Sequence, residues 1–407
     1  MRMSKKTIMP KLRFQEYIST GEWCVHNLGN ISEHITEKVG NKQLITLSIS
    51  AGTGFVSQAE KFSRDISGNQ YKNYIHLRKG ELSYNKGNSK KFPQGCIYEL
   101  KDYDEAAVPN AFVSFRLHDD FVAGFYKGYF ENNFHGEQLK KFITSGARSD
   151  GLLNINPTDF FSIILPTPKE KEEQQKVADC LTSLDELIAA ENKKLALLKT
   201  HKKGLMQKLF PADGKSVPEW RFPEFRDCEE WKEKNLSSLC DMQAGTFIPA
   251  SDINDKKEND MHPCYGGNGL RGYTYSSTHS GEYPIIGRQG ALCGNVIYAA
   301  GDFHATEHAV VATAKSKIVA KWLYYLLISL NLNQYAIGQA QPGLSVQVLE
   351  KTAACAPYDE REQKKIAVCL SALDHLINVQ TEKIEALKLH KKGLMQGLFP
   401  SIGEVIK

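Results

Sequence analysis

The chain has 407 residues, of which 41% are hydrophobic and 24% charged, with a formal net charge of +4. These values are those of an ordinary soluble globular protein with room for two or three domains, and the small positive charge permits an anionic partner without requiring one. The sequence contains no run of 18 apolar residues and no apolar N-terminal region. Its nine cysteines include no Cys-x-x-Cys pair. We therefore expect a cytoplasmic protein without membrane spans or a disulfide framework.

The first part of the chain is predicted to be a tail, residues 1–9, followed by a globular domain, residues 10–171. Its opening segment, residues 10–28, shares eight of 19 residues with residues 218–236, including Arg13 with Arg221 and Trp23 with Trp231. The beginning of the domain is thus found twice, whereas the bodies that follow show little similarity. This pattern indicates a duplicated framework with diverged contents.

Residues 71–100 alternate in polarity and are interrupted by glycines, which predicts strands joined by turns. Basic residues alternate here with Tyr71, Tyr74 and Tyr84, as in surfaces that bind a phosphate backbone. The alternative is a solvated sheet face with lysines on edge strands. The candidate DNA-binding residues are Arg78, Lys79, Lys86, Lys90 and Lys91.

Residues 118–144 have a helical pattern with an aromatic face, and the loop SGARSDG follows them. Arg148 lies within this loop, and an arginine there could donate two hydrogen bonds to guanine in the major groove. A flexible surface loop explains the same residues equally well.

Residues 172–211 and 361–400 agree at 23 of 40 positions and share an unbroken HKKGLMQ. Both have apolar residues at alternating spacings of three and four over about four heptads, which predicts two helices of a coiled coil. Phe-Pro ends each copy because proline cannot continue a helix. The predicted seam consists of Leu181, Leu184, Ile188, Leu195, Leu198 and Leu205 in the first copy, and Leu370, Leu373, Ile377, Ile384, Leu387 and Leu394 in the second.

A helix of about 40 residues is roughly 60 Å long, so the segments before and after it must lie at opposite ends. If the second helix pairs with the first, it most simply runs antiparallel and returns the C-terminus to the neighbourhood of residue 10. We therefore predict an α+β fold with two mixed α/β domains, separated by an antiparallel two-helix coiled coil with pseudo-twofold symmetry. The alternative is two core helices of one large domain.

The second globular domain is predicted at residues 212–360, followed by the second helix, 361–400, and a C-terminal tail, 401–407. Residues 262–296 are rich in glycine, and Gly267, Gly269 and Gly272 satisfy the spacing G-x-G-x-x-G. A dinucleotide site requires a helix next, but the following residues favour a strand, so we reject that assignment. Tight turns that bring side chains close to a ligand fit better, and the candidates are Asn268, Arg271, Arg288, Gln289 and, in a later loop, Gln341.

Catalytic and metal-binding motifs are missing from the sequence. There is no phosphate-binding G-x-x-x-x-G-K-[ST] loop, and His304, Glu307 and His308 lack further ligands at a metal-site spacing, so structural histidines are expected. Asp359 with Glu362 fits a helix capping box better than a nuclease site. We therefore expect a chain without catalytic residues, metal or cofactor.

The duplicated framework of PKLRF…EW followed by EQ…HKKGLMQ…LFP closely resembles the DNA-specificity subunit of type I restriction-modification enzymes. The stretches YGGNGLRGY, IIGRQGALCGNV and AQPGLS resemble one class of its target-recognition domains. The resemblance implies that residues 10–171 and 212–360 each recognise one half of a split, asymmetric sequence in double-stranded DNA. It also implies that the paired helices set the gap and bind two modification subunits.

In the resembled family, the modification subunits methylate adenine with S-adenosylmethionine, and restriction subunits translocate and cut DNA with ATP and Mg²⁺. The resemblance therefore places those cofactors on partner subunits and none on this chain. Two alternatives remain open: the recognition end of a fused restriction-methylation enzyme, and a coiled-coil scaffold with two protein-binding lobes.

Overall fold

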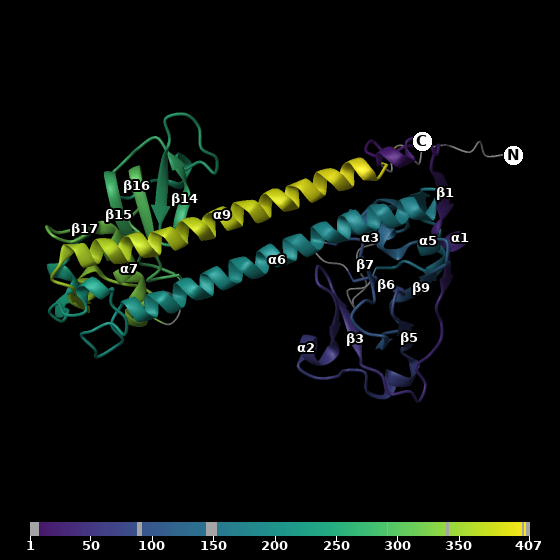
Figure 1. The fold of residues 1–407 in the computed structure, drawn as a ribbon, viewed down its shortest axis with the longest axis horizontal. Helices are drawn as coiled ribbons and strands as arrows, with labels where there is room; N and C mark the ends of the chain where they lie inside the picture. The colour runs from purple at the N-terminus through teal and green to yellow at the C-terminus, as the bar shows by residue number, and fades with distance from the viewer. Residues whose placement is uncertain are drawn as a thin grey trace. The chain divides into compact units, whose positions relative to one another are not determined.

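The computed structural model describes residues 8–87, 92–143, 153–290, 292–338, 342–400 and 403. The fold is α+β, and the chain divides into two compact units (Figure 1). The first unit contains Met1–Glu191 and Lys383–Lys407, and the second contains Asn192–Glu382. Both units contain parts of two long helices, α6 (Lys171–Leu209) and α9 (Glu360–Leu398).

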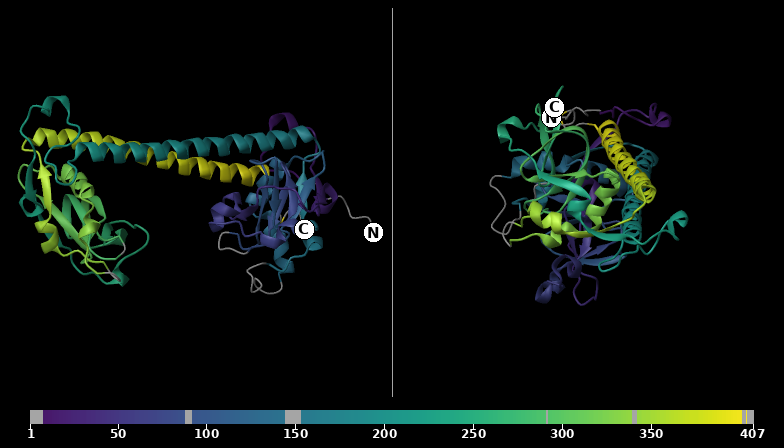
Figure 2. Two further views of the ribbon diagram at one scale, coloured as in Figure 1. Left: turned by 90° about the horizontal axis from the view of Figure 1, so that it is seen from below. Right: turned by 90° about the vertical axis from the view of Figure 1, so that its left-hand side faces the viewer.

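Within each unit, the segments of α6 and α9 that belong to it lie side by side (Figures 1 and 2). In the first unit, Asp185 of α6 pairs with Lys391 of α9, and Glu191 pairs with Lys383. The residue number therefore rises along α6 as it falls along α9. In the second unit, the Nζ of Lys202 lies 2.5 Å from the Oδ1 of Asp374. These pairs confirm the prediction of an antiparallel pair of helices.

All twelve predicted seam residues of α6 and α9 are buried or half-buried. Apolar residues of the same helices outside the seam are exposed, for example Leu187 at 42%, Leu197 at 62% and Leu389 at 70%. Burial therefore follows the heptad positions and not hydrophobicity alone, as a coiled-coil seam requires.

The first unit is built from short strands in four separate sheets. A four-stranded antiparallel sheet has the order β2-β9-β6-β7, and three two-stranded sheets pair β1 with β10, β3 with β4, and β5 with β8. The strands are β1 (Cys24–Asn27), β2 (Ser32–His34), β3 (Leu47–Ser50), β4 (Gly54–Ser57), β5 (Ile75–Arg78), β6 (Leu82–Asn85), β7 (Cys96–Glu99), β8 (Glu105–Val108), β9 (Val113–Leu117) and β10 (Ile164–Thr167). The short helices are α1 (Leu28–Ile31), α2 (Gln58–Phe62), α3 (Ala123–Glu131), α4 (Phe134–Leu139) and α5 (Pro157–Phe161).

The second unit contains one larger sheet with the strand order β12-β17-β15-β16-β13-β14, and a two-stranded sheet of β11 and β18. Only β13 and β16 pair in parallel among the neighbours in the larger sheet. The elements are β11 (Lys232–Asn235), β12 (Cys240–Ala244), β13 (His262–Gly266), β14 (Gly269–Thr274), β15 (His279–Gly287), β16 (Val296–Ala305), β17 (Ala309–Ala314), α7 (Ala320–Ser329), α8 (Val346–Lys351) and β18 (Ala353–Ala356).

Despite these different sheets, the same bonds attach each unit's globular part to its helices. The Arg13 guanidinium donates two hydrogen bonds of 2.7 Å to the Glu173 carboxylate at the start of α6. Arg221 binds Glu362 at the start of α9 in the same way, at 2.8 and 2.7 Å. Both pairs are buried, so each is a fixed, desolvated attachment point.

The strand pairs next to these attachments are also equivalent. Cys24 of β1 lies opposite Thr167 of β10, and Lys232 of β11 lies opposite Ala356 of β18. The first members of the two pairs are 208 residues apart and the second members 189, which are the spacings of the sequence repeat. The duplicated sequence therefore forms a duplicated structural framework.

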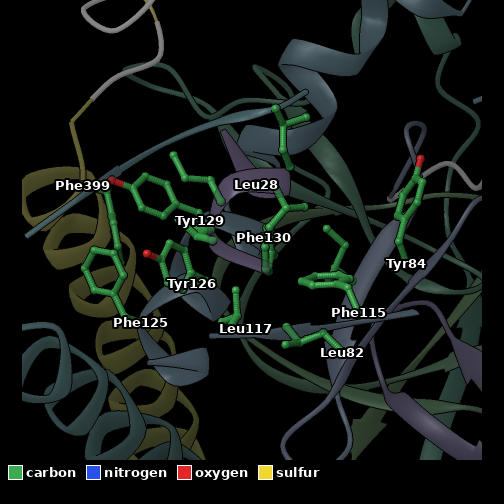
Figure 3. Close-up of a cluster of buried hydrophobic side chains, with 14 of the residues drawn as sticks. Leu28, Leu82, Tyr84, Phe115, Leu117, Phe125, Tyr126, Tyr129, Phe130 and Phe399 are labelled. Carbon is green, nitrogen blue, oxygen red and sulfur yellow. The ribbon is translucent and has the colours of Figure 1, made fainter. Parts of the chain in front are cut away.

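The C-terminal end of α9 belongs to the core of the first unit. The centre of the Phe399 ring lies 5.4 Å from that of Phe125 and 4.5 Å from that of Tyr129. Figure 3 draws these three side chains in the same buried cluster. The Leu12 amide donates to the Gly397 carbonyl at 2.8 Å. The predicted return of the C-terminus to the neighbourhood of residue 10 is thus confirmed.

The predicted capping box at the start of α9 is wrong. The Oδ1 of Asp359 accepts a hydrogen bond from the Arg361 amide at 2.8 Å, so Asp359 does cap the helix. Glu362, however, binds Arg221 instead of reaching back to the cap. A buried guanidinium attracts the carboxylate more strongly than a backbone amide does.

Two further absences hold within the described part of the chain. No helix there has the length and apolar character that crossing a bilayer requires. None of the nine cysteines is paired in a disulfide.

Candidate nucleic-acid interface

The glycine-rich segment of the second unit forms a hollow of about 450 Å³ beside the β13–β14 hairpin. The hairpin has only two connecting residues, Gly267 and Asn268, and the ends of β15 and β17 lie next to it. The hollow is lined by Gly266, Gly267, Asn268, Gly269, Leu270, Arg271, Gln289, Gly290, Thr306 and His308.

Close backbone contacts explain why glycines occur here. A Cβ on Gly287 would overlap the carbonyl of Gly267, and a Cβ on Gly267 would lie 3.1 Å from the Gln289 carbonyl oxygen. Gly269 has a φ of +97°, which favours glycine. The hairpin tip is therefore packed directly against the end of β15. As predicted, the glycines form tight turns, and β14 is the strand that excludes a dinucleotide site.

Three of the predicted binding residues, Asn268, Arg271 and Gln289, line this one hollow. Arg288 adjoins it, since its amide donates to the His308 carbonyl at 3.0 Å and its carbonyl accepts from the Leu344 amide at 2.9 Å. Gln341, the fifth candidate of this domain, lies outside the described residues. The fold thus collects side chains that are up to 21 positions apart in the sequence.

Two lining residues, Thr306 and His308, were not predicted as binding residues. The sequence singled out His308 only as an imagined metal ligand, because nothing local links residues 306–308 to residues 266–271. The link is the hydrogen bond from the Thr306 amide to the Tyr265 carbonyl, at 2.9 Å.

The electrostatics of the hollow favour an anionic or hydrogen-bonding ligand. Among the described residues, no carboxylate oxygen lies within 4 Å of the Arg271 or Arg288 guanidinium. Burial raises the pKa of the nearby Cys264 and Cys293 thiols, so both stay protonated and uncharged near neutral pH. The two arginines can therefore bind a phosphate or a base edge without first leaving an internal ion pair.

The histidines of this region are structural or solvent-facing. His304 is buried; its Nε2 donates to the Thr246 carbonyl at 3.1 Å, and its Nδ1 lies 2.9 Å from the Ser276 hydroxyl. His308 is half-buried, with its Nε2 3.1 Å from a Glu307 carboxylate oxygen. No group of three metal-binding side chains is found among the described residues.

In the first unit, the candidate arginine is already bound. Arg78 donates to both carboxylate oxygens of Glu37, at 2.8 and 3.0 Å, and lies 3.9 Å from Glu105. The hydrogen bonds from Arg78 and His76 lower the pKa of Glu37 to about 2. Arg78 would have to exchange this carboxylate for a phosphate in order to contact DNA.

The other candidates of the first unit are less well defined. Lys79 is exposed, with its Nζ 3.8 Å from Asp104, and Lys86 follows β6, where its carbonyl accepts from the Leu153 amide at 2.9 Å. Lys90, Lys91 and Arg148 lie outside the described residues.

The predicted alternation of basic and aromatic residues on this surface is wrong. Tyr84 is fully buried and donates to the Gln94 carbonyl at 2.7 Å, and Tyr74 is also buried. Tyr71 is half-buried and bonds to the backbone of Lys42 and Leu44. The tyrosines complete the core because each hydroxyl group finds a hydrogen-bond partner there.

Comparison with known proteins connects this architecture to a family. A family model described as "Type I restriction modification DNA specificity domain" matches residues 228–389, which include β11, the hollow and most of α9. The specificity subunit of the Escherichia coli restriction enzyme EcoprrI is 47% identical over 154 residues, which are 38% of this chain and 38% of that protein. That of Methanocaldococcus jannaschii MjaVIII is 26% identical over 288 residues, 64% of this chain and 67% of that protein.

Two solved structures share the fold. The S subunit of a type I restriction-modification system from M. genitalium has a TM-score of 0.65 and 16% identity, covering 97% of this chain and 100% of that one. A chain from a study of complex assembly and conformational transition of the type I restriction-modification system has a TM-score of 0.55 and 17% identity, covering 93% and 98%. Taken together, the matches show that residues 228–389 are similar to the DNA specificity domain of type I restriction-modification enzymes, that the chain aligns with 38% of the length of the EcoprrI subunit, and that its fold is that of the two solved structures.

Proposed function

We propose that this chain is the sequence-recognition subunit of a type I restriction-modification complex and catalyses no reaction itself. Each globular domain, residues 10–171 and 212–360, recognises one half of a bipartite, asymmetric target in double-stranded DNA. The observation that carries the proposal is that two units with the same framework bonds have different sheets. Two domains that are attached by the same bonds but contain different sheets are suited to recognise two different DNA sequences.

The hollow of the second unit has suitable chemistry for reading base edges. Arginine donates two hydrogen bonds to guanine, and asparagine or glutamine bonds in the same bidentate way to adenine. Arg271, Asn268 and Gln289 supply both kinds of group within one site. In the first unit, the basic candidates Lys79, Lys86, Lys90, Lys91 and Arg148, with Arg78 after exchange of Glu37, contact the other half-site.

The paired helices act as the spacer and as the docking surface for two modification subunits. The seven residues HKKGLMQ are identical in both copies, yet packing within the chain explains only some of them. Three side chains are exposed at matching positions in both copies: His201, Lys203 and Gln207 in α6, and His390, Lys392 and Gln396 in α9. Identical exposed surfaces on both units suit two copies of one partner.

The partner subunits carry the chemistry in this proposal. Modification subunits bind S-adenosylmethionine and methylate adenine, and restriction subunits use ATP and Mg²⁺. The assembled complex works on the DNA of the cytoplasm.

Selection from a degenerate duplex library tests the proposal. The full complex should enrich a split consensus with two unlike halves and a gap of constant length. Absence of enrichment at every salt concentration would instead support a scaffold with two protein-binding lobes. Salt must be varied, because phosphate contacts alone give affinity that falls steeply with ionic strength and carries no sequence preference.

A further inference from the structure

An exposed phenylalanine stands beside the hollow of the second unit. Phe247 lies in the connection after β12 and is 68% exposed, although the next residue, Ile248, is only 6% exposed. Large aromatic side chains are usually buried, and an exposed one at a binding site needs an explanation. The framework and the base-reading hollow do not supply one.

The backbone on the N-terminal side of Phe247 is firmly attached to the wall of the hollow. The Gly245 amide donates to the Ala309 carbonyl at 3.0 Å, and the Thr246 amide donates to the Ala305 carbonyl at 2.8 Å. A Cβ on Gly245 would overlap the Ala305 carbonyl, so only glycine permits this approach. Ala305 and Ala309 flank Thr306 and His308, which line the hollow.

A buried histidine, His304, binds the backbone of the same segment at Thr246. The Nε2 of His304 donates to the Thr246 carbonyl at 3.1 Å, and its Nδ1 lies 2.9 Å from the Ser276 hydroxyl. His304 is 4% exposed. Phe247 is thus an exposed apolar side chain that follows directly after Thr246, whose backbone is held by hydrogen bonds to Ala305 and His304.

Two further exposed apolar side chains lie at or near the same hollow. Leu270 lines it and is 53% exposed. Ile337 is 74% exposed and is bridged to Gly343, which is in turn bridged to the lining residue Gln289. A hollow with polar and cationic walls is therefore bordered by apolar groups, a combination that fits nucleic acid, with charged phosphates outside and apolar base faces inside.

We propose that Phe247 is a wedge that enters a base-pair step next to the bases read by the hollow and partly unstacks it. Inserted apolar side chains of this kind kink duplex DNA, and the cost of unstacking depends on the sequence of the step. Phe247 would then contribute to specificity at a position where no hydrogen bond is made. This inference rests on the proposed DNA-recognition function.

The test uses the full complex and a duplex that carries the consensus it selects from the degenerate library. Single 2-aminopurine substitutions are placed in turn along the half-site assigned to the second unit. Binding should raise the fluorescence at one step with the wild type and with Phe247→Leu, because unstacking relieves quenching, and Phe247→Ala should abolish the rise. Phe247→Ala should also bind the intact duplex about tenfold more weakly.

A mismatch at the same step separates a wedge from a simple contact. The mismatch removes most of the stacking that a wedge must break, so the tenfold defect of Phe247→Ala should shrink to less than about twofold. Tyr358→Ala is the matched control: Tyr358 is an aromatic residue of the same unit with 77% exposure, remote in sequence from the hollow, and its loss should change neither readout.

Three results would overturn the wedge. They are no fluorescence rise at any position, a rise that persists in Phe247→Ala, and a Phe247→Ala variant that loses a partner subunit while its DNA readouts stay unchanged. The last would identify a protein contact instead. If no consensus is selected at all, the proposed function itself fails, and the two failures are thus distinguishable.

Discussion

Arg271 and Arg78 are both arginines on β-strands of a candidate interface, but their surroundings differ. Arg78 is bound by both carboxylate oxygens of Glu37, whereas no described carboxylate lies within 4 Å of Arg271. A guanidinium in an internal ion pair must lose that pair before it binds DNA. We therefore expect Arg271 to contribute more to sequence recognition than Arg78.

Replacement of Arg271 by alanine should weaken binding to the selected target by about 1–3 kcal/mol and relax specificity at one base position. Arg288→Ala should behave similarly if Arg288 also reads a base. Arg226→Ala provides a control with an exposed arginine of the same unit. Competition binding with single-base variants measures the effect, and an equal loss of affinity for every sequence would identify a phosphate contact.

The ion pair of Arg78 predicts a pH dependence for the first unit. The pKa of Glu37 is lowered from 4.5 to about 2 by the hydrogen bonds from Arg78 and His76. A depressed folded-state pKa stabilises the fold above the unfolded pKa, and this stabilisation is lost as the pH falls from about 4.5 towards 2. Glu37→Gln should reduce the acid dependence of unfolding between these values. Equal pH profiles for the variant and the wild type would contradict the assignment.

The contrast between Arg78 and Arg271 also shows what the sequence could not reveal at this scale. Glu37 is 41 positions from Arg78, and its carboxylate reaches the arginine only because β5 pairs with β8 and the segment before β3 folds over them. Asn268, Arg271 and Gln289 could be identified from the sequence, because the glycines around them indicate tight turns in which the backbone can come close to a ligand. Phe247 and Thr306 gave no such signal, because only the fold brings them to the hollow.

At the scale of elements, glycine has opposite roles in two helices of this chain. A Cβ on Gly128 of α3 would overlap the ring of Phe399, whereas a Cβ on Gly204 of α6 would meet no atom within 4 Å. Gly128→Ala should therefore destabilise the chain by about 1–3 kcal/mol through overpacking. Gly204→Ala should stabilise the isolated chain by up to about 1 kcal/mol, since alanine favours helix.

Denaturant unfolding of the two variants measures this difference under identical conditions. Gly128→Ala combined with Phe399→Leu should recover part of the loss, because the smaller side chain leaves room for the methyl group. A Gly128→Ala variant as stable as Gly204→Ala would show that α9 does not pack against α3 as described.

The paired helices predict how the gap in the target can be changed. Lys202 of α6 pairs with Asp374 of α9, so the segment Lys194–Leu198 faces residues near 378–382. Insertion of seven residues into both segments preserves the heptad register and adds about 10 Å of helix, or about three base pairs. The selected gap should lengthen while both half-sites stay the same; an altered half-site would contradict a pure spacer.

The helices and the framework were the predictable elements, because a 3.5-residue period and a repeated sequence each specify geometry directly. Leu181 and Leu370 are buried seam residues in the structure, as their heptad positions required. The sheets were less predictable, because their short strands pair across long sequence separations, as β1 with β10. The capping-box error at Glu362 has the same origin, since its partner Arg221 is 141 positions away.

At the scale of the whole molecule, the same framework occurs in both units, whereas the sheets attached to it differ. The globular parts are attached by equivalent ion pairs, Arg13 with Glu173 and Arg221 with Glu362. They are also attached by equivalent backbone hydrogen bonds, from the Leu12 amide to the Gly397 carbonyl at 2.8 Å and from the Trp220 amide to the Lys208 carbonyl at 2.9 Å. These attachments leave the sheets free to differ. Modularity follows: one domain should be exchangeable without affecting the recognition by the other.

The most direct test of this account is selection from a degenerate duplex library by the wild-type complex and by a chimera whose residues 10–171 come from another specificity subunit. The account predicts two unlike half-sites at a constant gap for the wild type, of which the chimera changes one and keeps the other. A contiguous or palindromic consensus, or a chimera that changes both half-sites, would contradict it.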